Sequence, residues 1–150
     1  MVSKVLWANA PSVTADIITT QLNSLSNNTI SSASSEVDNS VNLDTFYWLE
    51  LNVTFGSAPT DANPNVDVYA TKALDGTNYE TAPVTGGTDC GYQYVGSFPV
   101  RKNTSAQNIQ IGPFAMPPTK LKFYLDNQTG VAFPASGSTV DIVVNNLEGQ

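Results

Sequence analysis

The stretch Val66-Asp-Val-Tyr-Ala-Thr-Lys-Ala-Leu-Asp-Gly-Thr-Asn-Tyr-Glu80 decides the fold class. In its first half, apolar and polar or aromatic side chains alternate with a period of two, as in a half-buried β-strand. Asp75-Gly76 follows, and this dipeptide readily accepts the positive φ angles of a tight turn. Tyr79 is expected to act as an aromatic plug after that turn. The stretch therefore predicts a strand and a turn, with no group suited to catalysis.

The same alternation recurs along the chain. In residues 44–56, Tyr47, Leu49, Leu51 and Val53 share one face, while Glu50 and Asn52 share the other. Further strands are predicted in residues 92–100, 107–114, 120–126 and 140–145, and a first strand is predicted within 14–25. Turn residues separate these segments. Seven or eight short strands of this kind favour two antiparallel sheets packed face to face.

Composition supports an all-β fold. The 150 residues include 15 Asn, 16 Thr and 14 Ser, which favour strands and turns over long helices. We expect an antiparallel two-sheet sandwich, jelly-roll-like, with an N-terminal arm. Residues 1–25 are interpreted as the arm and first strand, and residues 26–150 as a single sandwich domain.

Charge and hydropathy exclude several classes of partner. The formal net charge is −7 and only six residues are basic, so direct binding of nucleic acid is not expected. No apolar stretch approaches the roughly 18 residues of a membrane span, and the N-terminus has no apolar run long enough for a signal peptide. We expect a protein made in a cytoplasm without an export signal, and with no membrane association.

Catalytic chemistry has little support in the sequence. Histidine is absent, which removes the usual general base and the commonest transition-metal ligand. Glu50 and Glu80 are the nominal carboxylates for a glycosidase, but Glu50 is expected on the solvent face of a strand and Glu80 at the end of a turn. Cys90 has no basic neighbour to activate it. We therefore predict no enzymatic activity, no catalytic residues and no cofactor.

A calcium site remains an open alternative to the prediction of no metal. Asp61, Asn63, Asn65 and Asp67 place oxygen-bearing side chains at alternate positions, as at the start of a calcium loop. The glycine and the distal glutamate of an EF-hand loop are missing. A polar loop leading into a strand is the simpler interpretation.

Two apolar groups are candidate contact surfaces. Val5, Leu6 and Trp7 form a short cluster in the arm and are the candidate anchor. Phe46 and Trp48 lie on the strand face opposite Tyr47, which rules out a three-ring sugar platform. A subunit or partner interface at Phe46 and Trp48 is favoured over a sugar-stacking pair.

The chain also resembles a known family. The residues that carry the resemblance are Phe46-Tyr-Trp-Leu-Glu-Leu-Asn-Val53, Val66-Asp-Val-Tyr69, Asp75-Gly-Thr-Asn-Tyr79, Tyr94-Val-Gly-Ser-Phe98, Met116-Pro-Pro-Thr-Lys-Leu-Lys-Phe-Tyr-Leu-Asp-Asn127 and Thr129-Gly130. Together they resemble virion structural proteins of tailed bacteriophages, in particular jelly-roll capsid decoration (cement) proteins. The resemblance covers residues 40–148 and is one of strands and turns.

This resemblance implies a homotrimer on the outer capsid surface. Such a protein would bridge copies of the major capsid protein and stabilise the shell, with the arm reaching neighbouring subunits. The alternative is a carbohydrate-binding or adhesion module of a tail or baseplate. The sequence leaves open the position in the virion, the oligomeric state and glycan binding.

Overall fold

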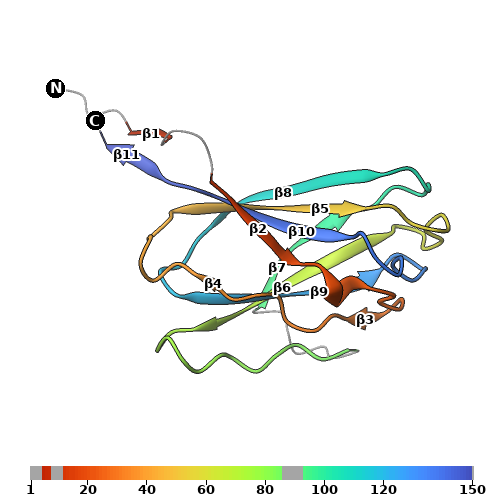
Figure 1. Cartoon of the computed structure of the whole chain (residues 1–150), viewed down its shortest axis with the longest axis horizontal. Helices are drawn as coiled ribbons and strands as arrows, with labels where there is room; N and C mark the ends of the chain where they lie inside the picture. The colour runs from red at the N-terminus through yellow and green to blue at the C-terminus, as the bar shows by residue number, and fades with distance from the viewer. Residues whose placement is uncertain (1–4, 8–11, 86–92, 150) are drawn as a thin grey trace.

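The computed structural model describes residues 5–7, 12–85 and 93–149, and it describes side chains for 16–85 and 93–146. Two antiparallel sheets lie face to face (Figure 1). The first sheet contains, in spatial order, β2 (Ser12–Ile18), β10 (Thr139–Asn145), β5 (Phe46–Val53) and β8 (Gln107–Ala115). The second contains β3 (Thr29–Ile30), β9 (Lys120–Gln128), β6 (Asn65–Ala73) and β7 (Tyr94–Pro99), and β4 (Val37–Asp38) pairs with β9. The expected two-sheet sandwich is confirmed.

The pairing of the strands is nested, which makes the sandwich a jelly roll. β6 pairs with β7, β5 with β8, β3 and β4 with β9, and β2 with β10. The chain is thus one long hairpin, folded so that its strands are shared between two sheets. The outermost pair continues the series, because β1 (Val5–Trp7) pairs with β11 (Leu147–Gly149). A short 3-10 turn, η1 (Thr20–Leu22), follows β2.

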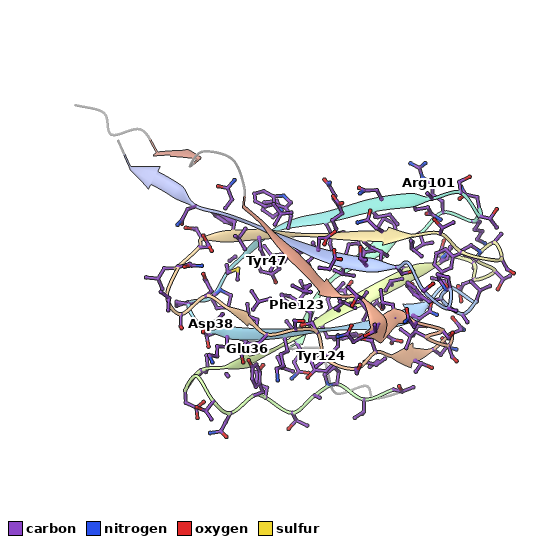
Figure 2. All side chains as sticks on the ribbon, viewed as in Figure 1. Glu36, Asp38, Tyr47, Arg101, Phe123 and Tyr124 are labelled. Carbon is purple, nitrogen blue, oxygen red and sulfur yellow. The ribbon has the colours of Figure 1, made fainter. Side chains whose placement is uncertain are left out.

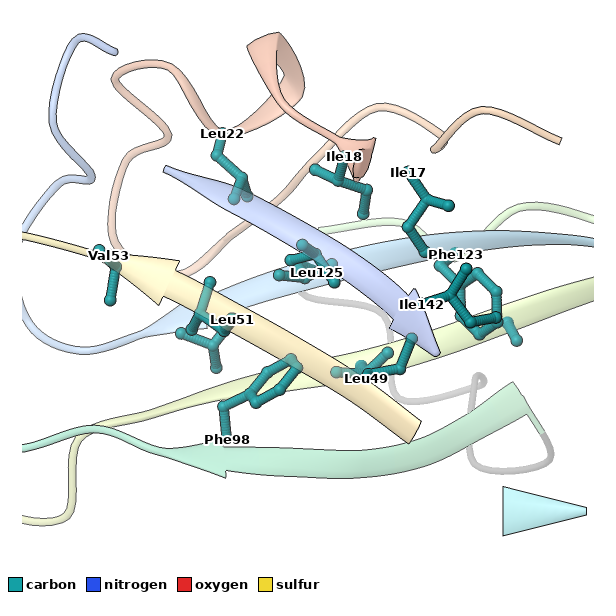
Figure 3. Packing of buried hydrophobic residues seen from close by; sticks show 14 of the residues in the cluster. Ile17, Ile18, Leu22, Leu49, Leu51, Val53, Phe98, Phe123, Leu125 and Ile142 are labelled. Atoms are coloured by element: carbon teal, nitrogen blue, oxygen red, sulfur yellow. The ribbon is translucent and has the colours of Figure 1, made fainter. Parts of the chain in front are cut away.

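Alternating side chains fill the space between the sheets. β5 alternates strictly between half-buried and buried residues, so Leu49, Leu51 and the other predicted inner residues face the core. Figure 3 shows Leu49, Leu51 and Ile142 of one sheet pointing toward Phe123 and Leu125 of the other. Burial of such a side chain contributes about 1.5–3 kcal/mol.

The core extends into the N-terminal segment. Ile17, Ile18, Leu22 and Leu25 are all buried in the central cluster. The predicted first strand is therefore part of the sandwich, and residues 16–25 are not an arm. The part that leaves the body is the ribbon of β1 and β11, which projects beyond one end of the sandwich (Figure 1).

The polar run 24–40 forms an edge of the second sheet. Ser31 N–H donates to Leu125 O and Ser34 N–H donates to Phe123 O, at 2.8 and 2.9 Å. The hydroxyls of the same serines accept from the N–H groups of Leu125 and Phe123, at 3.0 and 2.9 Å. The serine side chains thus continue the hydrogen bonding along the edge of β9, between the stretches of β9 that pair with the short strands β3 and β4. Residues 24–40 have no alternating apolar pattern, so this edge could not be predicted from them.

Candidate functional site

The ribbon of β1 and β11 contains the predicted anchor. Val5 pairs with Gly149, Leu6 with Glu148 and Trp7 with Leu147. Residues 5–7 and 147–149 therefore lie at the same end of the molecule (Figure 1). The side chains of Val5, Leu6 and Trp7 are outside the described part of the structure, so their anchoring role stays a prediction.

Phe46 and Trp48 lie on the outer face of the first sheet, near the ribbon end. Both are half-buried, and Val143 of β10 is the register partner of Trp48. A Cβ atom added at Gly112 of β8 would lie 3.0 Å from Trp48 Cδ1 and 3.1 Å from Trp48 Cα, so β8 approaches β5 closely at Trp48. The interface role predicted for Phe46 and Trp48 is untested by this geometry.

Tyr47 points the opposite way, as predicted. Its ring lies 5.4 Å from that of Phe114 and 5.7 Å from that of Phe123, between the two sheets (Figure 2). Burial raises the pKa of the Tyr47 hydroxyl well above its usual value. Tyr47 is therefore a core residue.

The other half of this outer face is polar. Glu50 accepts hydrogen bonds from the side-chain amides of Gln110, Asn108 and Asn52, at 2.5, 2.6 and 3.3 Å. These bonds, that from Gln110 foremost, hold the pKa of Glu50 below its usual range. The amides satisfy the carboxylate, so Glu50 contributes to cross-strand stabilisation of the sheet.

Asp141 is the register partner of Glu50 on β10. Its Oδ2 accepts from Asn52 Nδ2 at 3.1 Å. Burial, followed by the hydrogen bond and charge of Asp16, raises the pKa of Asp141 to about 6. Three carboxyl groups thus come together at the β2–β10–β5 crossing.

Glu50 and Glu80 do not face a common cleft. Glu50 lies on β5, whereas Glu80 lies beside β6 of the other sheet, where its N–H donates to Lys72 O and its Oε2 accepts from Lys72 N–H, both at 3.0 Å. A glycosidase pair would need the two carboxyl groups on opposite sides of one bond. These two residues do not have that arrangement.

Tyrosines line the outer face of the second sheet. Tyr69 of β6 is the register partner of Tyr94 on β7 and of Tyr124 on β9. The rings of Tyr69 and Tyr94 are 5.8 Å apart at 69°. Tyr94 is 49% exposed, but Tyr124 is only 8% exposed. This row was missed at the sequence level because it depends on the register of three strands.

The segment 79–85 crosses the same outer face and accounts for the burial of Tyr124. At its start, Tyr79 donates from its hydroxyl to Glu36 Oε2 at 2.6 Å, and Lys122 Nζ lies 4.3 Å from the ring centroid. Near its end, Thr85 Oγ1 accepts from Ile30 N–H at 3.1 Å. Tyr79 is partly buried on this outer face and is not part of the core between the sheets.

The predicted Asp75-Gly76 turn is confirmed. Gly76 has a φ of +77°, and Asp75 Oδ1 accepts from the N–H groups of Thr77 and Asn78, at 2.9 and 2.7 Å. The hydrogen bonds from Asn78 are the main cause that lowers the pKa of Asp75 to about 2. The Asp75 carboxylate therefore stabilises the turn itself.

The possible calcium loop uses its side chains internally. Asp61 Oδ1 accepts from Asn63 N–H at 3.3 Å, and Asn65 Nδ2 donates to Asp67 Oδ1 at 2.8 Å and to Ser97 Oγ at 2.9 Å. Among the described residues, no three carboxylate, thiolate or imidazole groups are placed to hold a metal ion. Cys90 lies outside the described residues.

Comparison of the chain with family models, with curated proteins and with solved structures gives no match. Within residues 5–7, 12–85 and 93–149, no helix is long and apolar enough to cross a membrane.

Proposed function

We propose that this chain is a non-enzymatic capsid decoration (cement) protein of a tailed bacteriophage. It binds the outer capsid surface, bridges copies of the major capsid protein and stabilises the shell as a homotrimer. It acts on the virion exterior after synthesis in the host cytoplasm. The proposal starts from the resemblance of residues 40–148 to such proteins.

The observation that carries the proposal is the separation of body and extension. The nested jelly roll has a single hydrophobic core, and the outermost strand pair, β1 with β11, leaves it as a two-stranded ribbon. An extension of this kind can reach a neighbouring subunit while the body stays on the surface. On a repeating lattice, several weak contacts of this type add up to firm attachment.

The internal bonding of the described polar groups fits a structural role. Glu50 is satisfied by three amides, and Asp75 is used in a turn. The acidic coat, with a net charge of −7, favours solubility before assembly.

Co-sedimentation with capsid shells that lack the endogenous protein tests the proposal. The full chain should saturate the shells at a fixed number of copies per capsid protein and raise the temperature at which they rupture. Deletion of residues 1–11, which removes β1 and keeps β2, should leave a folded body with greatly reduced occupancy. Full-chain protein that fails to bind such shells would refute the proposal, and full occupancy by the deletion variant would refute the anchor.

A carbohydrate-binding or adhesion module of a tail or baseplate is the second candidate. It is favoured by the Tyr69 and Tyr94 rings beside Asp67 on the second sheet, because aromatic rings and carboxylates are common partners of sugars. A glycan array distinguishes the two functions. Binding abolished by Tyr94→Ala, with Trp48→Ala as the comparison at the first sheet, would support this candidate against the capsid role.

A further inference from the structure

The two sheets meet differently along their two long sides. On one side, β2 lies near the segment 31–38, and Ser35 N–H donates to Ile17 O at 2.9 Å across the gap between the sheets. On the other side, β7 and β8 are the outermost strands of their sheets. We call this second side, formed by β7, β8 and the loop 100–106, the seam.

The hydrophobic core comes close to the surface along the seam. Five apolar residues pack against the core while only partly buried, and four of them are on β7 or β8: Val95, Ile109, Ile111 and Phe114. A Cβ added at Gly96 of β7 would lie 3.1 Å from the Phe114 ring, so the Phe114 side chain of β8 packs against the backbone of β7. The core is therefore covered less completely here than on the opposite side.

The backbone along the seam is also available for pairing. β8 is nine residues long and pairs with β5 on one side. No strand among the described residues pairs with its other side. Long edge strands usually carry charged side chains that prevent pairing with another chain. None of the residues of β7 or β8 is charged, and the two prolines, Pro99 and Pro113, lie at the end of β7 and beyond Ile111 in β8, so residues 107–111 keep an open edge.

Charge indicates which partner fits the seam. A chain of net charge −7 repels its own copies, except through a surface that is neutral or locally basic. Arg101 lines a hollow of about 550 Å³ beside β8, and Lys72 lines one of about 220 Å³ nearer the ribbon end. Among the described residues, neither forms an ion pair. The seam is thus uncharged along its strands and basic at its two hollows, which complements the acidic surface of another copy.

We propose that the seam is the surface through which copies of this chain associate. It buries Ile109 and Ile111 against the neighbouring copy and pairs the free edge of β8. The inference rests on the proposed function, because it assigns the subunit contact of the homotrimer. It also moves that contact from Phe46 and Trp48 to β7 and β8.

Sedimentation velocity of the full chain and of Ile109→Lys tests the assignment. The lysine stem can keep the aliphatic contact while its ammonium group reaches solvent, so the monomer should still fold. The wild type should sediment at a multiple of the 16.0 kDa monomer, and the variant as the monomer at the same concentration. Val41→Lys is the matched control, since Val41 is 82% exposed in the β4–β5 connection, and it should keep the wild-type mass.

Asn108→Lys provides a second variant on the same edge. Asn108 is exposed and donates to Glu50, and lysine can keep that contact while it adds a charge to β8. Circular dichroism and thermal unfolding establish that both variants are folded. An oligomer that survives both substitutions would overturn the assignment, and so would a wild type that is monomeric at all concentrations.

Shell binding separates this inference from the proposed function. An oligomer that the seam variants dissociate, but that does not bind shells, supports the seam and refutes the capsid role. Monomeric wild type that binds shells, with binding lost in Ile109→Lys, shows that the seam contacts the shell and overturns association of copies through it.

Discussion

The two long sides of the sandwich differ in how completely they cover the shared hydrophobic core. The closed side, made of β2, β3, β4 and the segments between them, is joined by backbone bonds such as that from Ser35 N–H to Ile17 O. It also carries the ion pair of Lys120 Nζ with Glu36 at 3.0 Å. The seam, in contrast, has uncharged strands and half-buried apolar residues. This difference between the two sides is the basis of the association proposed at the seam.

The largest expected effect is on the core behind the closed side. Phe123→Ala removes a fully buried ring that packs against Tyr47, and should cost about 3–5 kcal/mol of unfolding free energy. Ile111→Ala at the seam should cost only about 1–2 kcal/mol, since its side chain is half-buried. Chemical denaturation at several protein concentrations measures both. If copies associate through the seam, the loss of unfolding free energy caused by Ile111→Ala should grow with protein concentration. A loss that is the same at every concentration would contradict association through the seam.

A smaller effect is expected at the buried amide that ties the closed side together. Asn127 Nδ2 donates to Leu25 O at 3.0 Å and to Val131 O at 2.8 Å, and its Oδ1 accepts from Thr129. Asn127→Ala leaves these buried groups without partners and should cost about 2–3 kcal/mol. Thermal unfolding measures the loss. A destabilisation no larger than that of the exposed Asn78→Ala would contradict this role.

Asp141 of β10 should give the unfolding free energy a pH dependence of about 1 kcal/mol. Its folded pKa of about 6 lies above the model-peptide value of 3.8, so the folded state holds its proton more tightly. This contribution is fully present below pH 3.8 and is lost as the pH rises to about 6. The full pKa shift of Asp141 would correspond to a larger free energy, but solvent screens much of this carboxyl group. Asp141→Asn should abolish the decline between pH 4 and 6, measured by urea denaturation, and an unchanged decline would exclude Asp141 as its source.

The smallest effect is expected at the segment 79–85. Tyr79→Phe removes the hydrogen bond to Glu36 but keeps the ring beneath Lys122. The global stability should change by less than about 0.5 kcal/mol, as is usual at a surface site. Hydrogen exchange should nevertheless become faster at Glu80 N–H, which bonds to Lys72 O. Unchanged exchange would mean that Tyr79 does not hold the segment.

The fold class and the inner face of most long strands can be predicted from the amino-acid sequence alone. Strict alternation in Val66–Ala70 and Tyr47–Val53 depends only on the period of a strand, so it could be read locally. The Asp75-Gly76 turn is also local, because its bonds join residues within three positions. The polar Glu50 and Asn52 were correctly predicted on the outer face for the same reason.

Which strands are neighbours, and which edges stay open, could be learned only from the tertiary structure. The serines of the polar run complete the edge of the second sheet through bonds to residues about 90 positions away, with no local signal. Tyr79 was predicted only as an aromatic plug after the turn, because the face that it covers depends on its distant partners Glu36 and Lys122. The tyrosine row and the seam likewise depend on strand register and order. Those are set by long-range pairing, which the period of a single strand does not contain.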